Sequence, residues 1–167
     1  MMYREEEKHP ELRAFCMVLY VITALSAVLQ VFESTLMVGL LFLVVAYMMV
    51  GAQKMTARKT IYQSHIEYVA KTLSMGMGVI FPIAMVLAIY LIWKNTDISA
   101  IKAAIDSDDP DSMMSIVNRY VTGGMQIAQD IILKTMALPV FWWVRRCLVG
   151  FLRAKNSEPV DYPDSWI

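Results

Sequence analysis

The hydrophobic positions of this chain fall into four long runs that are separated by shorter polar stretches. Three runs contain no charged residue, at residues 14–32, 36–52 and 72–93, and a fourth covers residues 120–144. A helix needs about 20 apolar residues to cross the hydrocarbon core of a bilayer, with a range of about 17–25. The pattern therefore predicts an all-α integral membrane four-helix bundle. Its first two spans form a tight hairpin around residues 33–35.

The fourth run differs from the others because it carries two charged residues, Asp130 and Lys134. Each unpaired charge near the centre of a spanning helix costs about 2.5–3.5 kcal/mol, and this cost roughly cancels the gain from the surrounding apolar residues. Their spacing places both side chains on one helix face, with the acid before the base, which is the favourable order. We therefore expect an ion pair that faces the bundle. It is either structural, which we favour, or part of a path for ions or protons.

Two connecting segments also have helical patterns. The segment 57–71 has apolar positions at helical spacing, which predicts an amphipathic cytoplasmic helix that runs into the third span. The segment 94–119 is acidic, and its apolar positions predict a short helix, a break at Pro110 and then a helix that leads into the fourth span. Small residues four positions apart, Thr23 and Ala27 in the first span and Ser74 and Gly78 in the third, predict a close contact between these two spans.

The distribution of basic residues predicts the orientation of the spans. Three basic residues precede the first run, four lie in the link 53–71, and four follow the fourth run, which makes 11 of the 15 in the chain. Basic segments stay in the cytoplasm, and this pattern requires four crossings with both termini cytoplasmic. Trp142 and Trp143 would then mark the inner membrane interface, and Tyr90 and Trp93 the outer one.

The composition agrees with this interpretation and argues against several classes of function. The 167 residues are 57% hydrophobic and 18% charged, whereas soluble domains carry about 25% charged residues. We expect one membrane domain over residues 1–167 with a cytoplasmic tail at 145–167. The formal charge of zero argues against nucleic-acid binding. The sequence has no Gly-rich phosphate loop, HExxH helix or Ser-His-Asp grouping, so we expect no enzyme and no cofactor.

Metal and disulfide sites have little support. The two cysteines, Cys16 and Cys147, are far apart and have no CxxC partner, so we expect them to be small buried apolar side chains. The acidic segment 106–112 lacks the glycine and the bidentate glutamate of a calcium-binding EF-hand loop. The 14 methionines are not grouped with histidine as a copper path would require, and we interpret them as flexible packing residues.

His65 is the most distinctive polar residue of the link helix. Glu67 follows it two positions later and points to a different side of the helix, so the two do not form a metal pair. We expect His65 to face the bundle together with Tyr68 and Thr72 and to act as a hydrogen-bonding anchor rather than as a metal ligand. The candidate binding residues are His65, Tyr68, Asp130 and Lys134.

Two short motifs extend these observations. One reads TIYQSHIEYVAKT, from Thr60 to Thr72, and the other reads WVRRCLVGFL, is followed by Pro159, and is accompanied by Tyr20 in the first span. Together they resemble an uncharacterised bacterial family of predicted four-span membrane proteins. That family is distantly similar to the membrane subunit of the chloroplast inner-envelope protein-import translocon. The resemblance covers about residues 15–160 and implies a four-helix membrane bundle, a role in protein translocation or membrane assembly, and no catalytic residues.

Three functional interpretations remain after this comparison. The preferred one is an accessory protein of a bacterial inner membrane that binds another membrane protein or forms a homo-oligomer within the lipid bilayer. The second is a channel, transporter or protein-translocation component in which Asp130 and Lys134 line the path. The third is an immunity protein against a pore-forming toxin, which would use the outer loop 94–119. The first three spans contain few polar side chains, which argues against a pathway for solutes.

Overall fold

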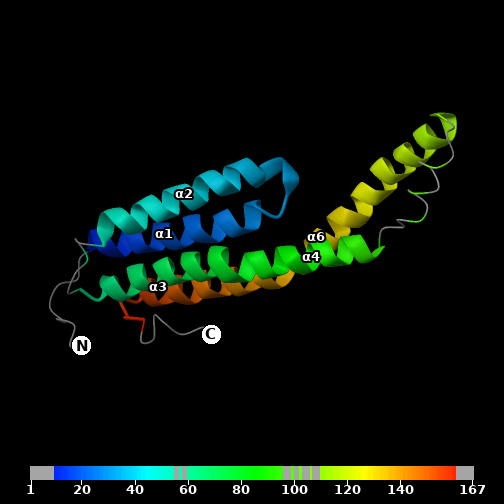
Figure 1. The fold of residues 1–167 in the computed structure, drawn as a ribbon. Coiled ribbons are helices and arrows are strands. Elements are labelled where there is room, and N and C mark those ends of the chain that lie inside the picture. The colour runs from blue at the N-terminus through cyan, green and yellow to red at the C-terminus, as the bar shows by residue number, and fades with distance from the viewer. Residues whose placement is uncertain are drawn as a thin grey trace. The chain divides into compact units, whose positions relative to one another are not determined.

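The fold is built from helices throughout the part of the chain that the computed structural model describes, which is residues 10–54, 57, 60–95, 99, 102, 106 and 110–160. The main helices are α1 (Pro10–Leu29), α2 (Leu36–Gln53), α3 (Tyr62–Met75), α4 (Phe81–Asn95) and α6 (Pro110–Lys155) (Figure 1). Four helical stretches are long and apolar enough to cross a membrane: Pro10–Leu29, Leu36–Gln53, Tyr62–Asn95 and Gly123–Lys155. The predicted all-α fold with four candidate spans is confirmed.

A tight turn joins α1 to α2, as the short polar link predicted. A 3-10 turn at Glu33–Thr35 precedes α2, and the Thr35 hydroxyl donates a hydrogen bond to the carbonyl of Leu29 at 2.8 Å. Gly39 lies against the end of α1, where a Cβ atom would come within 2.8 Å of the Gln30 backbone nitrogen. A glycine is therefore required for this close approach. Helix α1 ends at Leu29, three residues before the predicted end of the first span.

The third span belongs to a longer helical stretch that begins at Tyr62, so the predicted helix leading into this span is confirmed. A five-residue π-helical turn, Gly76–Ile80, separates α3 from α4. It lies immediately before the first turn of α4, which contains Pro82. Because proline has no amide hydrogen and its ring clashes with the preceding turn, regular α-helix is interrupted there. A π-helical turn accommodates such an interruption within a continuous helix.

The helix that leads into the fourth span begins at Pro110, as predicted. Proline is favoured at the first position of a helix, since the amide hydrogen that it lacks would have no acceptor there. Helix α6 has 46 residues, so at 1.5 Å per residue it is about 69 Å long, more than twice the thickness of the hydrocarbon core. Only part of α6 can therefore lie within a membrane. Most of the short helix that was predicted before Pro110 lies outside the described residues.

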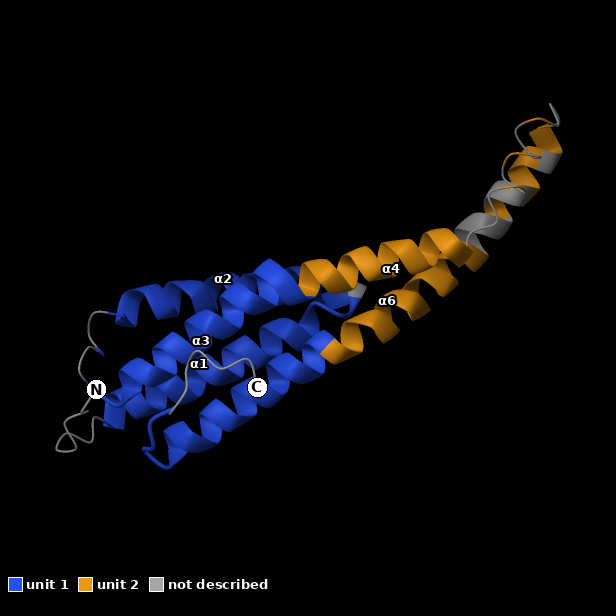
Figure 2. Cartoon of the chain, turned by 60° about the horizontal axis from the view of Figure 1, so that its bottom comes forward, with its two compact units in different colours: residues 1–80, 139–167 blue, residues 81–138 orange. Residues whose placement is uncertain are grey.

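The chain divides into two compact units, which Figure 2 shows in different colours. Unit 1 contains residues 1–80 and 139–167, and unit 2 contains residues 81–138. Both boundaries lie beside a proline, Pro82 in α4 and Pro139 inside α6. Unit 1 therefore contains α1, α2, α3 and the last turns of α6, and it holds the buried polar residues described below.

The core of unit 1 is formed by one face of each of its helices. In α1, α2 and the last turns of α6 the buried positions are adjacent or three to four residues apart, so they follow one side of each helix: Cys16, Leu19, Tyr20, Thr23, Ser26 and Ala27; Gly39, Leu43, Ala46 and Val50; Pro139, Trp143, Arg146, Cys147, Gly150 and Ala154. The outward faces carry large apolar side chains, such as Leu41, 60% exposed, and Met48, 68% exposed. Apolar outer faces are expected where lipid is the solvent. Both cysteines are buried, as predicted.

Two predictions about packing were wrong. Ser74 and Gly78 are exposed, and Gly76 makes the close contact instead, because a Cβ atom there would overlap the ring of Trp143. Gly76 follows Thr72 by four residues and shares its buried face, whereas Ser74 and Gly78 point away from it. Trp143 is fully buried, so it does not mark the lipid interface. Tyr90 and Trp93 in unit 2 are exposed, at 52% and 62%, as interface residues would be.

Candidate functional site

Buried polar side chains gather in unit 1 on α1, α3 and the last turns of α6. Six of them are at most 1% exposed: Thr23, Ser26, Ser64, His65, Thr72 and Arg146. Buried polar groups need hydrogen-bond partners, since leaving one unpaired costs about 1–3 kcal/mol. Most of these side chains bond to the backbone of their own helix, but four of them also or instead join different parts of the chain: Ser64, His65, Thr72 and Arg146.

His65 uses both ring nitrogens to connect α3 to two other segments. Its Nε2 atom donates to the backbone carbonyl of Glu158 at 2.8 Å. Because a carbonyl only accepts, Nε2 carries the hydrogen of the neutral ring, and Nδ1 accepts from the Tyr20 hydroxyl at 3.0 Å. The predicted inward orientation of His65 together with Tyr68 and Thr72 is confirmed, since all three are buried.

The segment that follows α6 reaches His65 because the helix ends in a sharp reversal. The Glu158 amide donates to the Arg153 carbonyl at 2.9 Å, and Ser157 has a φ of 58°. This is the pattern of a Schellman cap, in which glycine usually occupies the left-handed position. The amide of Val160 then donates to the Ser64 hydroxyl at 3.0 Å. Residues 156–160, named here the C-terminal turn, are thus bonded to α3 at two adjacent positions.

Arg146 is a buried arginine inside a candidate span. Its Nε atom donates to the Thr72 hydroxyl at 3.1 Å. Its guanidinium carbon lies 4.1 Å from the ring centroid of Tyr68 and 5.2 Å from that of Trp142. Aromatic faces attract a cation, and this attraction is strongest where water is excluded. Ionisable residues inside membrane spans are commonly functional, so Arg146 joins the candidate residues.

The sequence analysis counted Arg146 only among the basic residues that set the orientation. A signal for its burial was present, because Trp143, Arg146 and Gly150 follow one another at steps of three and four residues and share one helix face. Arg145 lies on another face and is exposed. Both arginines belong to the four basic residues that follow the fourth run, and a count of basic residues does not distinguish a buried arginine from an exposed one.

Tyr20 links the contacts of His65 to those of Arg146. Its ring centroid lies 5.9 Å from that of His65 and 6.4 Å from that of Tyr68, the ring that Arg146 covers. Gly150 allows this position, because a Cβ atom there would overlap the Tyr20 ring. Tyr20, His65, Tyr68, Thr72 and Arg146 thus form one continuous group within unit 1, which we name the polar cluster.

The remaining predicted pair, Asp130 and Lys134, lies in unit 2. Lys134 Nζ is 2.6 Å from Asp130 Oδ2, which confirms the ion pair. The expectation that the pair faces the interior was wrong, because the Lys134 and Asp130 side chains are 73% and 58% exposed. Met136 is buried two residues later, so the buried face of this part of α6 lies on the other side of the helix. Ile127 and Leu138 flank the pair on its own face and are also exposed.

The geometry of the polar cluster is that of a connection between helices. The Tyr20 and His65 side chains are 1% and 0% exposed, so their contact is closed to molecules from outside. Among the residues that the structure describes, no three His, Cys, Asp or Glu side chains are grouped as metal ligands would be. The exposed pair in unit 2, by contrast, is open to a partner.

Comparison with known proteins does not assign this chain to a family. No family model matches it, and no curated protein or solved structure is significantly similar to it.

Proposed function

We propose that this chain is a multi-pass membrane protein that works by binding another membrane protein through one face of α6. That face consists of Ile127, Asp130, Lys134 and Leu138, which follow one another at steps of three and four residues; we name it the α6 stripe. The observation that carries the proposal is the exposure of an ion pair inside the candidate span Gly123–Lys155.

The cost of exposing charges to lipid favours contact between the α6 stripe and another protein. A charged residue near the centre of a spanning helix costs about 2.5–3.5 kcal/mol when it meets lipid. Pairing between Asp130 and Lys134 offsets part of this cost, and polar groups on a neighbouring helix offset more, at about 0.6–2 kcal/mol for each hydrogen bond. Ile127 and Leu138 are 52% and 77% exposed and would supply apolar packing on both sides of the pair. The resemblance to a family grouped with a protein-import subunit points to the same class of partner, a membrane protein complex.

We also propose that both termini lie in the cytoplasm of a bacterial cell. The basic residues before the first span, in the link 53–71 and after the fourth span support this orientation. The contacts of His65 with Tyr20 in α1 and with Glu158 after α6 are compatible with it, because they bring together segments that four crossings would leave on one side. Reporter domains fused after Ile167 and inserted near Met55 should both report cytoplasm. A periplasmic signal from the C-terminal fusion would contradict four crossings.

Co-purification in a mild detergent tests the interaction. Three tagged forms of the full chain are compared: the natural sequence, Asp130→Asn with Lys134→Met, and Arg145→Met as a control that changes an exposed charge elsewhere in α6. We expect the natural chain and the control to retain the same membrane protein. The double variant should retain at least tenfold less of that protein. Equal recovery by all three forms would contradict the proposal. If only a second copy of this chain is recovered, the stripe binds the chain itself, and the protein is a homo-oligomer.

A further inference from the structure

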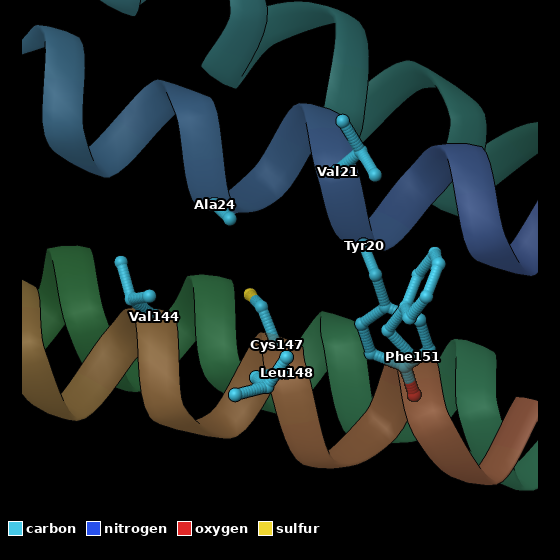
Figure 3. Close-up of a pocket in the computed structure, with 7 residues that line it drawn as sticks. All are labelled: Tyr20, Val21, Ala24, Val144, Cys147, Leu148 and Phe151. Atoms are coloured by element: carbon cyan, nitrogen blue, oxygen red, sulfur yellow. The ribbon is translucent and has the colours of Figure 1, made fainter.

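An apolar groove lies between α1 and the last turns of α6, entirely within unit 1. Its volume is about 240 Å³, and its lining includes Tyr20 and Ala24 from α1 and Val144, Cys147, Leu148 and Phe151 from α6. Figure 3 shows these side chains on the two facing helices, with only the short side chain of Ala24 opposite Val144 and Cys147. No polar atom lines the groove.

Two exposed basic residues extend the two helix faces that form the groove. Arg13 precedes Tyr20 by seven residues, about 10 Å along α1, and Lys155 follows Phe151 by four residues, about 6 Å along α6. Steps of four and seven residues keep a side chain on the same helix face. The helices run in opposite directions, because Tyr20 lies beside Phe151, whereas Ala24, one turn later in α1, lies opposite the earlier α6 residues Val144 and Cys147 (Figure 3). Arg13 and Lys155 therefore lie toward the same end of the groove.

We propose that this groove binds one acyl chain of an anionic phospholipid, whose head group is held by Arg13 and Lys155. A groove with purely apolar walls in a membrane protein takes up hydrocarbon rather than water. Two cations at one end select a negative head group. This inference does not depend on the proposed partner, since the α6 stripe belongs to unit 2.

Native mass spectrometry of the full chain in detergent tests the proposal. The probes are dioleoyl phosphatidylglycerol, which is anionic, and dioleoyl phosphatidylcholine, which is not. We expect one tightly held phosphatidylglycerol, bound about 25-fold more weakly after Arg13→Gln with Lys155→Gln, since each basic group near an anionic surface contributes a factor of about five. Arg145→Gln is the matched control, because Arg145 is exposed on another face of α6 and should leave binding unchanged.

A second pair of variants tests the groove itself. Ala24→Phe fills it and should abolish retention of the lipid, whereas Val18→Phe, at an exposed position on another face of α1, should not. The charge variants keep the proposal testable if Ala24→Phe does not fold, because Arg13 and Lys155 are both exposed. Equal retention of the two lipids by the natural chain would overturn the proposal. So would an unchanged affinity in the Arg13→Gln, Lys155→Gln variant.

Discussion

Replacing Gly76 by alanine tests the packing between α3 and the last turns of α6. A Cβ atom on Gly76 would overlap the six-membered ring of Trp143, which is fully buried. Overpacking of a filled core costs about 1–3 kcal/mol. Gly78 lies in the same π-helical turn but has nothing within 4 Å of its Cβ position, so alanine there should be neutral or stabilise by about 0.5–1 kcal/mol. The free energies of unfolding of the two variants should therefore differ by about 1–4 kcal/mol.

Reversible unfolding in mixed micelles, followed by circular dichroism as the denaturing detergent is increased, gives these free energies. The Trp143→Leu background identifies the mechanism. Without the indole ring the overlap is gone, so the effect of Gly76→Ala should shrink to less than half, and the double-mutant cycle isolates the contact. Equal stability of the Gly76→Ala and Gly78→Ala variants would refute the close approach of the two helices.

Three further substitutions test the polar cluster and the C-terminal turn in the same unfolding assay. Arg146→Ala should destabilise by about 2–4 kcal/mol because it removes a buried side chain that packs on an aromatic ring. The control Arg145→Ala should change the stability by no more than about 0.5 kcal/mol. Similar effects at both positions would contradict the burial of Arg146. His65→Ala leaves the buried Tyr20 hydroxyl and the part-buried Glu158 carbonyl without their hydrogen bonds and should destabilise by about 2–4 kcal/mol. An unchanged stability would show that these bonds do not hold the helices together. Ser157→Gly should stabilise by about 1 kcal/mol, since glycine adopts the left-handed conformation at no steric cost, and a loss of stability would argue against the Schellman cap.

The spans could be predicted from the sequence because lipid imposes a simple requirement of length and apolarity. The uncharged runs at 36–52 and 72–93 lie within helical stretches that the structure shows. Helix ends depended on local contacts that hydropathy does not encode. The first span ends at Leu29 because a threonine hydroxyl caps its carbonyl there, although the following residues are still apolar.

The candidate site was predicted in part. The orientation of His65 followed from helical spacing, because a residue one turn from Tyr68 and two turns from Thr72 shares their face. Its partners could not be predicted, since the Glu158 carbonyl reaches it only through a reversal at Ser157, where no glycine marks the turn. The exposure of the Asp130–Lys134 pair also escaped prediction, because spacing shows that two residues share a face but not where that face points.

Site-specific photo-crosslinking in living membranes tests the central claim most directly, that the α6 stripe contacts another membrane protein. A photo-reactive amino acid is placed at Leu138, which is 77% exposed on the stripe, and in a control at Leu133, which is 49% exposed on another face of α6. We expect Leu138 to give a discrete adduct with one membrane protein, and this adduct should disappear when Asp130→Asn and Lys134→Met are added. The control position should give lipid adducts alone. Lipid adducts alone at Leu138, or the same protein adduct at both positions, would contradict the account.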